Sequence, residues 1–304
     1  MQYSVIVASY NSKYEDLITT IDSILIQKDI EFEIIVCDDG SEDSHFTELK
    51  KHFEDKNFTE YKLIGDGINR GTVKNVLRGL RVAEGRYAKL IGAGDALYDE
   101  DTLRRVREFM IKERTECCFG RVWGFTYRDD NIVHIPRQIP RDLRAYRKQN
   151  TKHIVRNILL CEDWVSGAAI FATTRYYVKY ISMLEGTVLY CEDWSTALAI
   201  LDHRVLKFFD AYVMKYEVSE GVSNNLTFRQ KLLQDNVNFW KLFDELCESG
   251  GHIEFEKYIK KRKRKKKYDD VRNTLLMYLL KTFAVPEMLL YELDCRIQKL
   301  LSKK

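Results

Sequence analysis

The chain has 304 residues, of which 45% are hydrophobic and 31% are charged, and this composition excludes an intrinsically disordered or collagen-like chain. The formal net charge of +3 is unevenly spread, because residues 1–223 hold 31 Lys and Arg against 35 Asp and Glu, whereas residues 224–304 hold 18 against 11. An acidic body with a basic C-terminal part indicates that the basic part meets an anionic partner.

The first hundred residues alternate between strand and helix patterns. Short apolar runs predict strands at Tyr3–Ala8, Glu33–Cys37, Tyr61–Ile64 and Tyr87–Ile91. Helical spacing of apolar residues follows a predicted capping box of Ser12 and Glu15, and returns over residues 44–53 and from Val73 to Leu80. This alternation predicts parallel strands covered by helices, with ligands bound beyond the carboxyl ends of the strands.

The rest of the chain changes character twice. Residues from about 117 to 223 mix strand and helix patterns, and the residues after Ser223 are mainly helical. Helices are expected at Phe228–Leu246, around Tyr258, at Val271–Phe283 and after Pro286. The sequence therefore predicts an α/β domain over residues 1–223 and a basic, mainly helical C-terminal extension over residues 224–304.

Three of the predicted strands end in polar loops. Ala8-Ser9-Tyr10-Asn11 ends the first, Cys37-Asp38-Asp39-Gly40-Ser41 ends the second, and Gly92-Ala93-Gly94-Asp95 ends the fourth. Taken alone, an Asp-Asp-Gly-Ser sequence is an ordinary turn. Because the carboxyl ends of parallel strands share one edge of a sheet, we expect the three loops together to form one binding surface.

These loops resemble those of the inverting glycosyltransferases of the family-2 type. The resemblance extends, in order and spacing, to Asn69-Arg70-Gly71, Asn75, Gly85-Arg86-Tyr87 and Glu192-Asp193-Trp194. It covers roughly residues 1–220 and leaves the C-terminal part outside. It implies the GT-A fold, which is a Rossmann-like, mostly parallel sheet flanked by helices. It also implies transfer of a sugar from a nucleotide-diphosphate sugar to a hydroxyl acceptor, with inversion.

The resemblance implies specific roles for the loop residues. Asp39 is expected to contact the base or ribose of the nucleotide, for which UDP is favoured as the common nucleotide of the family. The other expected donor-binding residues are Ser9, Tyr10, Asn11, Asp38, Arg70, Asn75 and Gly94. Asp95 is expected to hold Mg²⁺ or Mn²⁺ on the donor diphosphate. Asp193, next to Glu192, is expected to be the general base.

The metal loop departs from the family pattern. The family usually has Asp-x-Asp-Asp, whereas this chain has Gly92-Ala93-Gly94-Asp95 and keeps only the last carboxylate. One carboxylate, two phosphate oxygens and several waters can still hold Mg²⁺, which retains much of its water shell. The alternative is a catalytically weak or silent homologue that binds nucleotide sugars.

The sequence Cys-Glu-Asp-Trp occurs twice, at 161–164 and 191–194. Only one copy can supply the base. The second is followed by a helix-like segment (Ser195–Leu201) and a strand-like one (Val205–Phe209), as the family expects. The first is followed by residues 165–171, which resemble the segment that lines the acceptor pocket. Asp193 is therefore preferred over Asp163 as the base.

A loose glycine pattern, Gly65-Asp-Gly67-Ile-Asn-Arg-Gly71, offers a different interpretation. Glycines between a strand and a helix can bind dinucleotides, which would favour a nucleotide-dependent oxidoreductase. The spacing is not G-x-G-x-x-G, and the pattern follows the third strand instead of the first. We therefore expect a flexible loop that lets Arg70 approach the donor.

Eight consecutive cations, Lys260–Lys267, form the strongest charge feature. They could be a solvated helix end. A nucleic-acid site is disfavoured because no aromatic platform accompanies them. Docking on an anionic membrane surface is preferred, since each cation near such a surface contributes about 1 kcal/mol. The resemblance favours the same interpretation, because many relatives use lipid-diphosphate acceptors at the inner face of the bacterial membrane. It implies a hydroxyl-bearing glycan or lipid-linked acceptor and a role in bacterial cell-surface polysaccharide or glycolipid synthesis.

The sequence also bears on location. No basic leader precedes the first apolar run, and no apolar stretch approaches the roughly 18 residues that cross a bilayer. The seven cysteines are odd in number and lack metal-ligand spacing, which favours reduced thiols. We expect a cytoplasmic protein that attaches peripherally to the inner face of the membrane.

Overall fold

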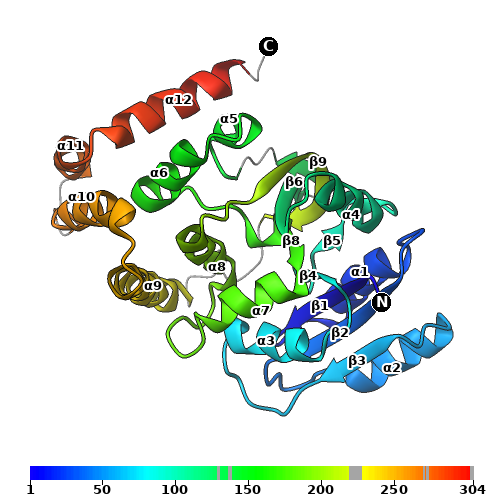
Figure 1. Cartoon of the computed structure of the whole chain (residues 1–304). Coiled ribbons are helices and arrows are strands. Elements are labelled where there is room, and N and C mark those ends of the chain that lie inside the picture. Colours follow the sequence, from blue (N-terminus) through cyan, green and yellow to red (C-terminus); the bar gives the residue numbers. More distant parts are fainter. Residues whose placement is uncertain (129–130, 136–138, 219–227, 270, 272–273, 302–304) are drawn as a thin grey trace. The chain divides into compact units, whose positions relative to one another are not determined.

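The computed structural model describes residues 1–128, 131–135, 139–218, 228–269, 271 and 274–301 (Figure 1). The chain divides into two compact units. Unit 1 holds residues 1–137, 166–196 and 206–239, and unit 2 holds residues 138–165, 197–205 and 240–304. The predicted boundary after residue 223 lies outside the described residues. In this division, two segments from within residues 1–223 cluster with the C-terminal helices.

Unit 1 is built on one nine-stranded sheet. Its strands are β1 (Tyr3–Ser9), β2 (Phe32–Asp38), β3 (Tyr61–Ile64), β4 (Tyr87–Gly92), β5 (Ala96–Leu97), β6 (Cys117–Arg128), β7 (Asn131–Ile135), β8 (Ile170–Thr173) and β9 (Lys207–Glu217). Their order is β3-β2-β1-β4-β8-β6-β9-β5, and β7 pairs with β6. The four strands predicted in the first hundred residues are confirmed, and they pair in parallel with one another. Strands β6 and β9 also pair in parallel.

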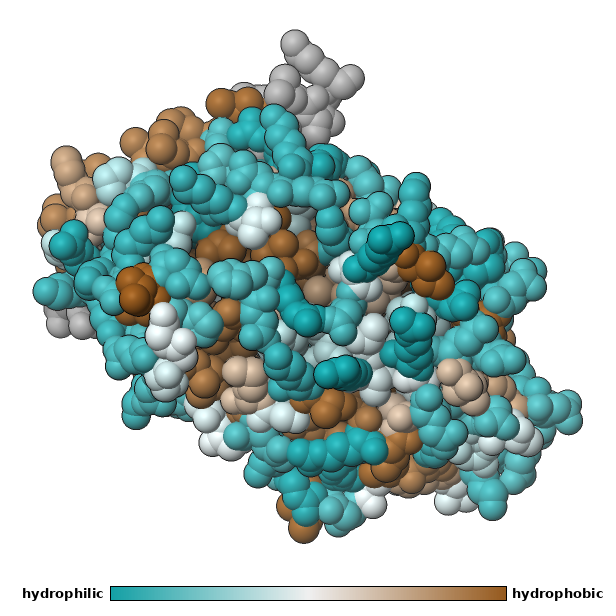
Figure 2. Space-filling model, in the orientation of Figure 1, coloured by the Kyte–Doolittle hydropathy of each residue, from teal (hydrophilic) through white to brown (hydrophobic). Residues whose placement is uncertain are grey.

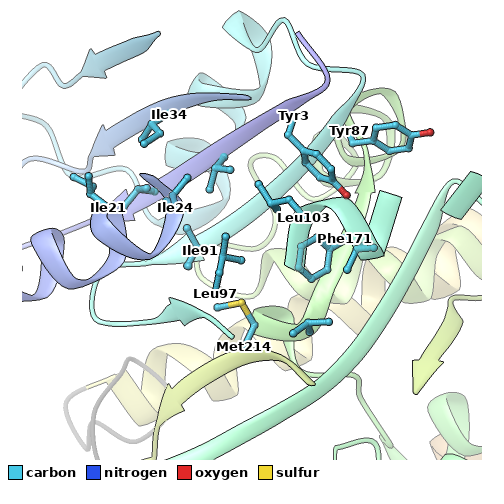
Figure 3. Close-up of a cluster of buried hydrophobic side chains, with 14 of the residues drawn as sticks. Tyr3, Ile21, Ile24, Ile34, Tyr87, Ile91, Leu97, Leu103, Phe171 and Met214 are labelled. Atoms are coloured by element: carbon cyan, nitrogen blue, oxygen red, sulfur yellow. The ribbon is translucent and has the colours of Figure 1, made fainter. Parts of the chain in front are cut away.

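Alternation along the parallel strands gives the sheet two buried faces. Val5 and Val36 join a core with helices α1 (Tyr14–Leu25), α2 (Phe46–Asp55) and α4 (Thr102–Lys112), part of which is drawn in Figure 3. Ile6 and Cys37 point the other way, toward Gly79 of α3 (Thr72–Val82). Because a strand places successive side chains on opposite faces, runs buried throughout indicate a sheet covered on both sides.

The start of α1 corrects one prediction. The helix begins at Tyr14, and its N-cap is Lys13, which makes no side-chain capping bond. Ser12 instead accepts a hydrogen bond from the Ser9 hydroxyl, at 3.1 Å between the two Oγ atoms. The capping box of Ser12 and Glu15 is therefore wrong, because the Ser12 hydroxyl takes part in the loop that ends β1.

Unit 2 is helical. It contains α5 (Leu143–Arg147), α6 (Thr151–Cys161), α10 (Glu256–Lys266), α11 (Thr274–Ala284) and α12 (Glu287–Leu301). Helix α9 (Arg229–Ser249) begins in unit 1 and ends in unit 2. Helices α10 and α12 both pack against α6, which is the physical reason that residues 138–165 belong with the C-terminal part. The helices predicted after residue 223 are confirmed, with ends shifted by a few residues.

Among the described residues, no helix by itself has the length and hydrophobicity needed to cross a membrane. Helices α11 and α12 reach that length and hydrophobicity only together, and the chain bends by 109° at the break between them.

Candidate active site

The three polar loops meet at one edge of the sheet, as predicted. Strand β1 lies between β2 and β4 and runs parallel to both, with Ser9 opposite Asp38 and Ala8 opposite Gly92. Backbone bonds continue beyond the strands, because the Asp39 N–H donates to the Ser9 carbonyl at 2.9 Å and the Ala93 N–H donates to the Ala8 carbonyl at 3.1 Å. The register of these strands thus holds the loops side by side.

The loop after β1 is held by the loop after β2. Asn11 adopts a left-handed backbone with φ of 48°. Its N–H donates to Ser41 Oγ at 2.8 Å, and its Oδ1 accepts from the Glu42 N–H at 3.0 Å. Tyr10 is 45% exposed at this edge. Asn11 therefore shapes the loop, whereas the Tyr10 ring is open to a ligand.

Asp38 and Asp39 have different surroundings. The Asp38 carboxylate accepts from the N–H groups of Gly40 and Ser41, at 3.1 and 2.9 Å, and from the Ser41 hydroxyl. It therefore closes its own turn. Asp39 is also buried, and burial raises the pKa of its carboxyl group, against the lowering effect of two backbone donors.

Those two donors come from the loop before α3. Asp39 Oδ1 accepts from the Arg70 N–H at 2.8 Å and Oδ2 from the Gly71 N–H at 2.9 Å. Gly71 has φ of 85°, and a Cβ there would lie 2.7 Å from the Leu189 carbonyl oxygen, so the turn requires glycine. Since each carboxylate oxygen has two lone pairs, Asp39 keeps acceptor capacity for a ligand.

Two predicted donor-binding residues have other partners here. The Arg70 guanidinium pairs with Asp66 at 2.6 Å and is one-third exposed. Asn75 is buried on α3, where its Nδ2 donates to the Cys37 carbonyl at 2.7 Å. Asn75 therefore fastens α3 beneath the carboxyl end of β2. A direct contact of either residue with the donor stays a prediction.

The loop after β4 brings Gly94 and Asp95 to the same edge. Gly94 has φ of 94°, and its N–H donates to Thr20 Oγ1 at 2.9 Å. The Thr20 hydroxyl donates in turn to the Asp95 carbonyl at 2.7 Å. The Asp95 carboxylate is half-buried. This loop offers one carboxylate to a cation, and that suits a hard divalent ion whose other ligands are phosphate oxygens and water.

Another acidic group also has metal-ligating chemistry. Among the described residues, Asp43, His45 and Glu48 are the group whose ligand atoms lie within 4.8 Å of one another. They lie at the start of α2, and the two carboxylates are exposed. A surface group of this kind is common without an ion, so it carries no functional assignment.

Glu192 and Asp193 form a short 3-10 helix, η2 (Glu192–Trp194), after α7 (Thr174–Ser182). Asp193 packs closely against Gly167, where an added Cβ would come within 3.0 Å of the Asp193 Cβ. Burial raises the pKa of both carboxyl groups, and the neighbouring Asp193 charge raises that of Glu192 further. Backbone N–H groups of Gly167 and Trp194 act against the shift at Asp193. A carboxylate with a raised pKa is a better proton acceptor near neutral pH.

Lys89 was missed by the sequence analysis because it stands inside an apolar strand. It is fully buried, and its Nζ donates to the Ala168 carbonyl at 2.6 Å and the Ile170 carbonyl at 3.3 Å. These bonds tie the segment η1 (Gly167–Ala169), and with it the packing surface of Asp193, to β4. Burial lowers the pKa of Lys89 to about 7, and the charges of Asp95 and Glu192 act in the opposite direction.

Asp235 is a second residue that sequence patterns did not reveal. It is a buried carboxylate on α9 that accepts from the Leu189 N–H at 3.0 Å and the Tyr190 N–H at 2.7 Å. The segment leading into Glu192 is therefore fastened from α9. The sequence carries little signal for this role, because Asp235 stands on α9 among polar residues such as Gln234 and Asn236, as a solvent-exposed aspartate also would.

Asp163, in the first copy of the repeated motif, belongs to unit 2 and has structural partners. Its carboxylate accepts from the Arg141 N–H at 2.7 Å and the Asp142 N–H at 3.2 Å, and it also bonds to the Tyr291 hydroxyl. Burial raises its pKa. A carboxylate with three donors inside a helical unit braces that unit.

The cations of the basic run Lys260–Lys267 have two kinds of surroundings, buried or paired within unit 2 and exposed to solvent. Arg262 is buried, pairs with Asp244 and lies over the Trp240 ring at 3.9 Å. Lys261 pairs with Glu287, and Lys265 donates to the Leu160 carbonyl at 3.0 Å. Lys260, Lys263, Arg264, Lys266 and Lys267 are exposed. Arg262, Lys261 and Lys265 therefore hold α10 within unit 2. The other five cations are exposed, although Lys263 also pairs with Asp244 at 3.3 Å.

A cavity of about 850 Å³ lies elsewhere, at the start of β4 and the end of β8, and is lined by Arg86, Tyr87, Arg114, Thr173 and Arg175 among others. Tyr87 begins β4, whereas Gly92 ends it. This cavity is thus at the opposite end of the strand from the three loops, and we assign it no part in the site.

Sequence and structure comparisons agree with this geometry. Residues 4–162 match the family described as glycosyl transferase family 2. A Mycobacterium tuberculosis protein named "PGL/p-HBAD biosynthesis glycosyltransferase Rv2957" is 29% identical over 137 residues, which are 42% of this chain and 52% of that protein. A Mycobacterium bovis protein named "PGL/p-HBAD biosynthesis glycosyltransferase" gives the same values. The chain thus spans about half the length of the curated relatives it matches.

Solved structures share the fold. S. aureus TarS 1-349 aligns with a TM-score of 0.54 at 17% identity, over 95% of this chain and 82% of that one. The structure of TarS 1-349 in complex with UDP-GlcNAc aligns with a TM-score of 0.52 at 16% identity, over 94% of this chain and 80% of that one. The predicted GT-A fold with C-terminal helices is confirmed. The family match ends at residue 162, so Glu192 and Asp193 lie beyond it. Because the family match covers more than half of the chain and the chain has the GT-A fold, the chain belongs to glycosyl transferase family 2.

Proposed function

We propose that the chain transfers a sugar from a nucleotide-diphosphate sugar, with UDP favoured, to a hydroxyl acceptor with inversion at the anomeric carbon. The observation that carries this proposal is the convergence of the loops after β1, β2 and β4, with Asp39 and Asp95 at one sheet edge. In open α/β sheets, ligands bind beyond the carboxyl ends of the strands.

The donor binds with its base and ribose toward Asp39. The Asp39 carboxylate is fixed by two backbone donors, so it meets the nucleotide without losing rotamer freedom. Its remaining lone pairs accept from a uracil N–H or ribose hydroxyls. Tyr10, exposed beside it, offers a ring face to the base. Solved structures of S. aureus TarS 1-349 in complex with UDP and with UDP-GlcNAc share this fold and support a nucleotide-sugar ligand.

The reaction is one displacement. The acceptor oxygen gives its proton to the Asp193 carboxylate and bonds to the anomeric carbon, while the bond from that carbon to the diphosphate oxygen breaks. Attack from the face opposite the leaving group inverts the configuration. Asp193 is the proposed base because it belongs to the same unit as the three loops and has a raised pKa. Glu192 is its neighbour in the chain, and burial and the Asp193 charge raise the pKa of Glu192 while the nearby Lys89 lowers it.

Asp95 would hold Mg²⁺ or Mn²⁺. A bound cation supplies charge neutralisation at the leaving diphosphate. Asp95 is the carboxylate that this loop presents, and the half-buried loop around it is fixed by Thr20, so the ligand position is defined before the donor arrives. A catalytically silent nucleotide-sugar-binding homologue is the second candidate. The observation that favours it is the replacement of the other family carboxylates by Gly92 and Gly94.

We also propose that the acceptor is a glycan or lipid-linked hydroxyl compound in bacterial cell-surface polysaccharide or glycolipid synthesis, and that the protein acts in the cytoplasm at an anionic membrane surface. The mycobacterial relatives support a bacterial setting. The exposed cations of the basic run support the surface, because an anionic headgroup layer attracts them. Lys260 and Lys263 also pair with Glu256 and Asp244. Arg262, Lys261 and Lys265 take no part in this attraction.

Release of UDP from UDP-sugars tests the proposal. With Mn²⁺ present we expect UDP to appear above the no-enzyme rate from at least one of UDP-GlcNAc, UDP-glucose and UDP-galactose, faster when a hydroxyl acceptor is added. EDTA should abolish the release. Binding of UDP-sugars with no release under any of these conditions would instead identify the silent homologue.

A further inference from the structure

Helices α11 and α12 carry an apolar surface that the described part of unit 2 does not cover. It consists of side chains between 44% and 83% exposed, namely Leu275, Leu276, Leu279, Phe283, Leu289, Leu290, Leu293 and Ile297. Figure 2 shows hydrophobic residues along the margin that α11 and α12 occupy in Figure 1. A contiguous exposed patch of large aliphatic side chains is unusual for a soluble monomer and marks an interaction surface.

The residues of this surface follow helical spacing. Leu275, Leu279 and Phe283 recur every four residues on α11, and Leu289, Leu293 and Ile297 do so on α12. Residues four apart lie on one face of a helix. Each helix thus presents an apolar stripe, which is more than the scattered single side chains that any surface has.

The other face of α12 is occupied. Tyr291 and Cys295 are buried, Glu292 forms a two-pronged pair with Arg141 at 2.7 and 2.8 Å, and Asp294 pairs with Arg144 at 2.9 Å. These contacts fasten α12 to the neighbouring segments of unit 2. Its apolar stripe therefore faces outward because the opposite face already has its partners.

Exposed cations lie on the helix next to the apolar surface. Helix α10 packs against α11, and its exposed cations include Arg264, Lys266 and Lys267. Neighbouring helices that expose apolar and cationic side chains match an anionic lipid layer, which offers negative headgroups above a hydrocarbon interior. A second copy of the chain would match less well, because it would bring its own α10 cations toward these.

We propose that α11 and α12 lie in the plane of an anionic membrane and insert their apolar stripes to the level of the upper acyl chains, while the α10 cations bind headgroups. This inference rests on the proposed membrane association and adds the surface that makes it. Helix α11 has 11 residues, about 16 Å in length, which is half of a hydrocarbon core of about 30 Å. The helices therefore lie on the membrane and do not cross it.

Vesicle flotation with three matched variants tests the inference. The apolar variant is Leu275→Gln, Phe283→Gln and Leu290→Gln. The cation variant is Arg264→Gln, Lys266→Gln and Lys267→Gln. The control is Ile111→Gln and Leu233→Gln, which are 51% and 62% exposed on α4 and α9. Vesicles are phosphatidylcholine alone or with phosphatidylglycerol, at low and high salt, and thermal melting confirms that each variant folds.

We expect the apolar variant to lose about tenfold or more of its partitioning into anionic vesicles at both salt concentrations, because burial of hydrocarbon is not screened. The cation variant should lose a similar factor at low salt only. The control should bind like the unmodified chain. If the full triple variant fails to fold, Phe283→Gln alone, at the most exposed of these positions, replaces it.

Three results would overturn the inference. Unchanged vesicle binding by the apolar variant would show that the α11–α12 surface does not bind the membrane. If the cation variant still lost vesicle binding in that case, the proposed membrane association itself would stand. Absence of binding by the unmodified chain would remove both, while UDP release would still report on the transferase independently. A dimer without vesicles that becomes a monomer in the apolar variant would identify the surface as a contact between copies.

Discussion

Replacing Asp193 with Asn is expected to lower sugar transfer by roughly 10²-fold or more, since general-base catalysis is typically worth 10² to 10⁴. The amide keeps the shape that packs against Gly167 but cannot accept the acceptor proton. Nucleotide affinity should hardly change, because the base meets the acceptor and not the diphosphate. UDP release in the presence of acceptor measures the first quantity, and titration calorimetry with UDP measures the second.

Asp163→Asn is the matched control, because it makes the same change in the other Cys-Glu-Asp-Trp copy. The Asp163 carboxylate accepts hydrogen bonds from two backbone N–H groups. In the Asn variant, one of these N–H groups would face the side-chain N–H₂ group and lose its acceptor. We expect a loss of about 1–3 kcal/mol in the free energy of unfolding with transfer per folded molecule preserved. Loss of transfer in Asp163→Asn with activity retained in Asp193→Asn would show that the base is the other carboxylate.

The unmodified enzyme should also show a pH dependence set by Asp193. Only the carboxylate form accepts a proton, and burial raises the pKa of this group. Activity should therefore fall, as pH decreases, at a higher pH than for an ordinary aspartate. The acid limb of the pH–rate profile reports this, and an acid limb at the ordinary pKa of Asp would contradict it.

Asp39→Ala is expected to weaken UDP binding by roughly ten- to a hundredfold, the range for losing a hydrogen bond to a charged group. Asp39 holds the Arg70 and Gly71 N–H groups as well as the proposed nucleotide contact, so the substitution also frees the loop before α3. Asp43→Ala, at an exposed carboxylate four residues further along the chain, should leave UDP affinity unchanged. Unaltered affinity in a folded Asp39→Ala protein would remove Asp39 from the donor site.

The parallel strands β1 to β4 could be predicted from the sequence. Apolar runs identify the strands, and a helix between each strand and the next indicates that the strands run parallel. That direction is enough to bring Ser9, Asp38 and Gly92 to one edge. What each polar side chain does there could not be predicted. Asp38 and Asp39 are neighbours with the same chemistry, and only three-dimensional contacts distinguish the residue that closes a turn from the one that keeps acceptor capacity.

The roles of Lys89 and Asp235, which hold the segments around the proposed base, could not be predicted from the sequence for a related reason. Lys89 is a charged residue in an apolar strand and Asp235 is a charged residue on a largely polar stretch of α9. Each is buried only because a particular distant group satisfies it. Those groups, the Ala168 carbonyl and the Leu189 N–H, are 79 and 46 positions away. The same limit applies to the basic run, where Arg262 is buried because Asp244 and Trp240 happen to face it.

The most direct test of the central claim, a nucleotide-sugar site at the carboxyl ends of β1, β2 and β4, is a thermal-melting screen of the full chain with Mn²⁺. The ligands are UDP, several UDP-sugars, GDP-sugars and NADH. A ligand at 100 times its dissociation constant adds about 2.7 kcal/mol to the free energy of unfolding. We predict that UDP or a UDP-sugar raises the melting temperature and that NADH does not. Stabilisation by NADH alone would contradict the claim and favour a dinucleotide-dependent enzyme.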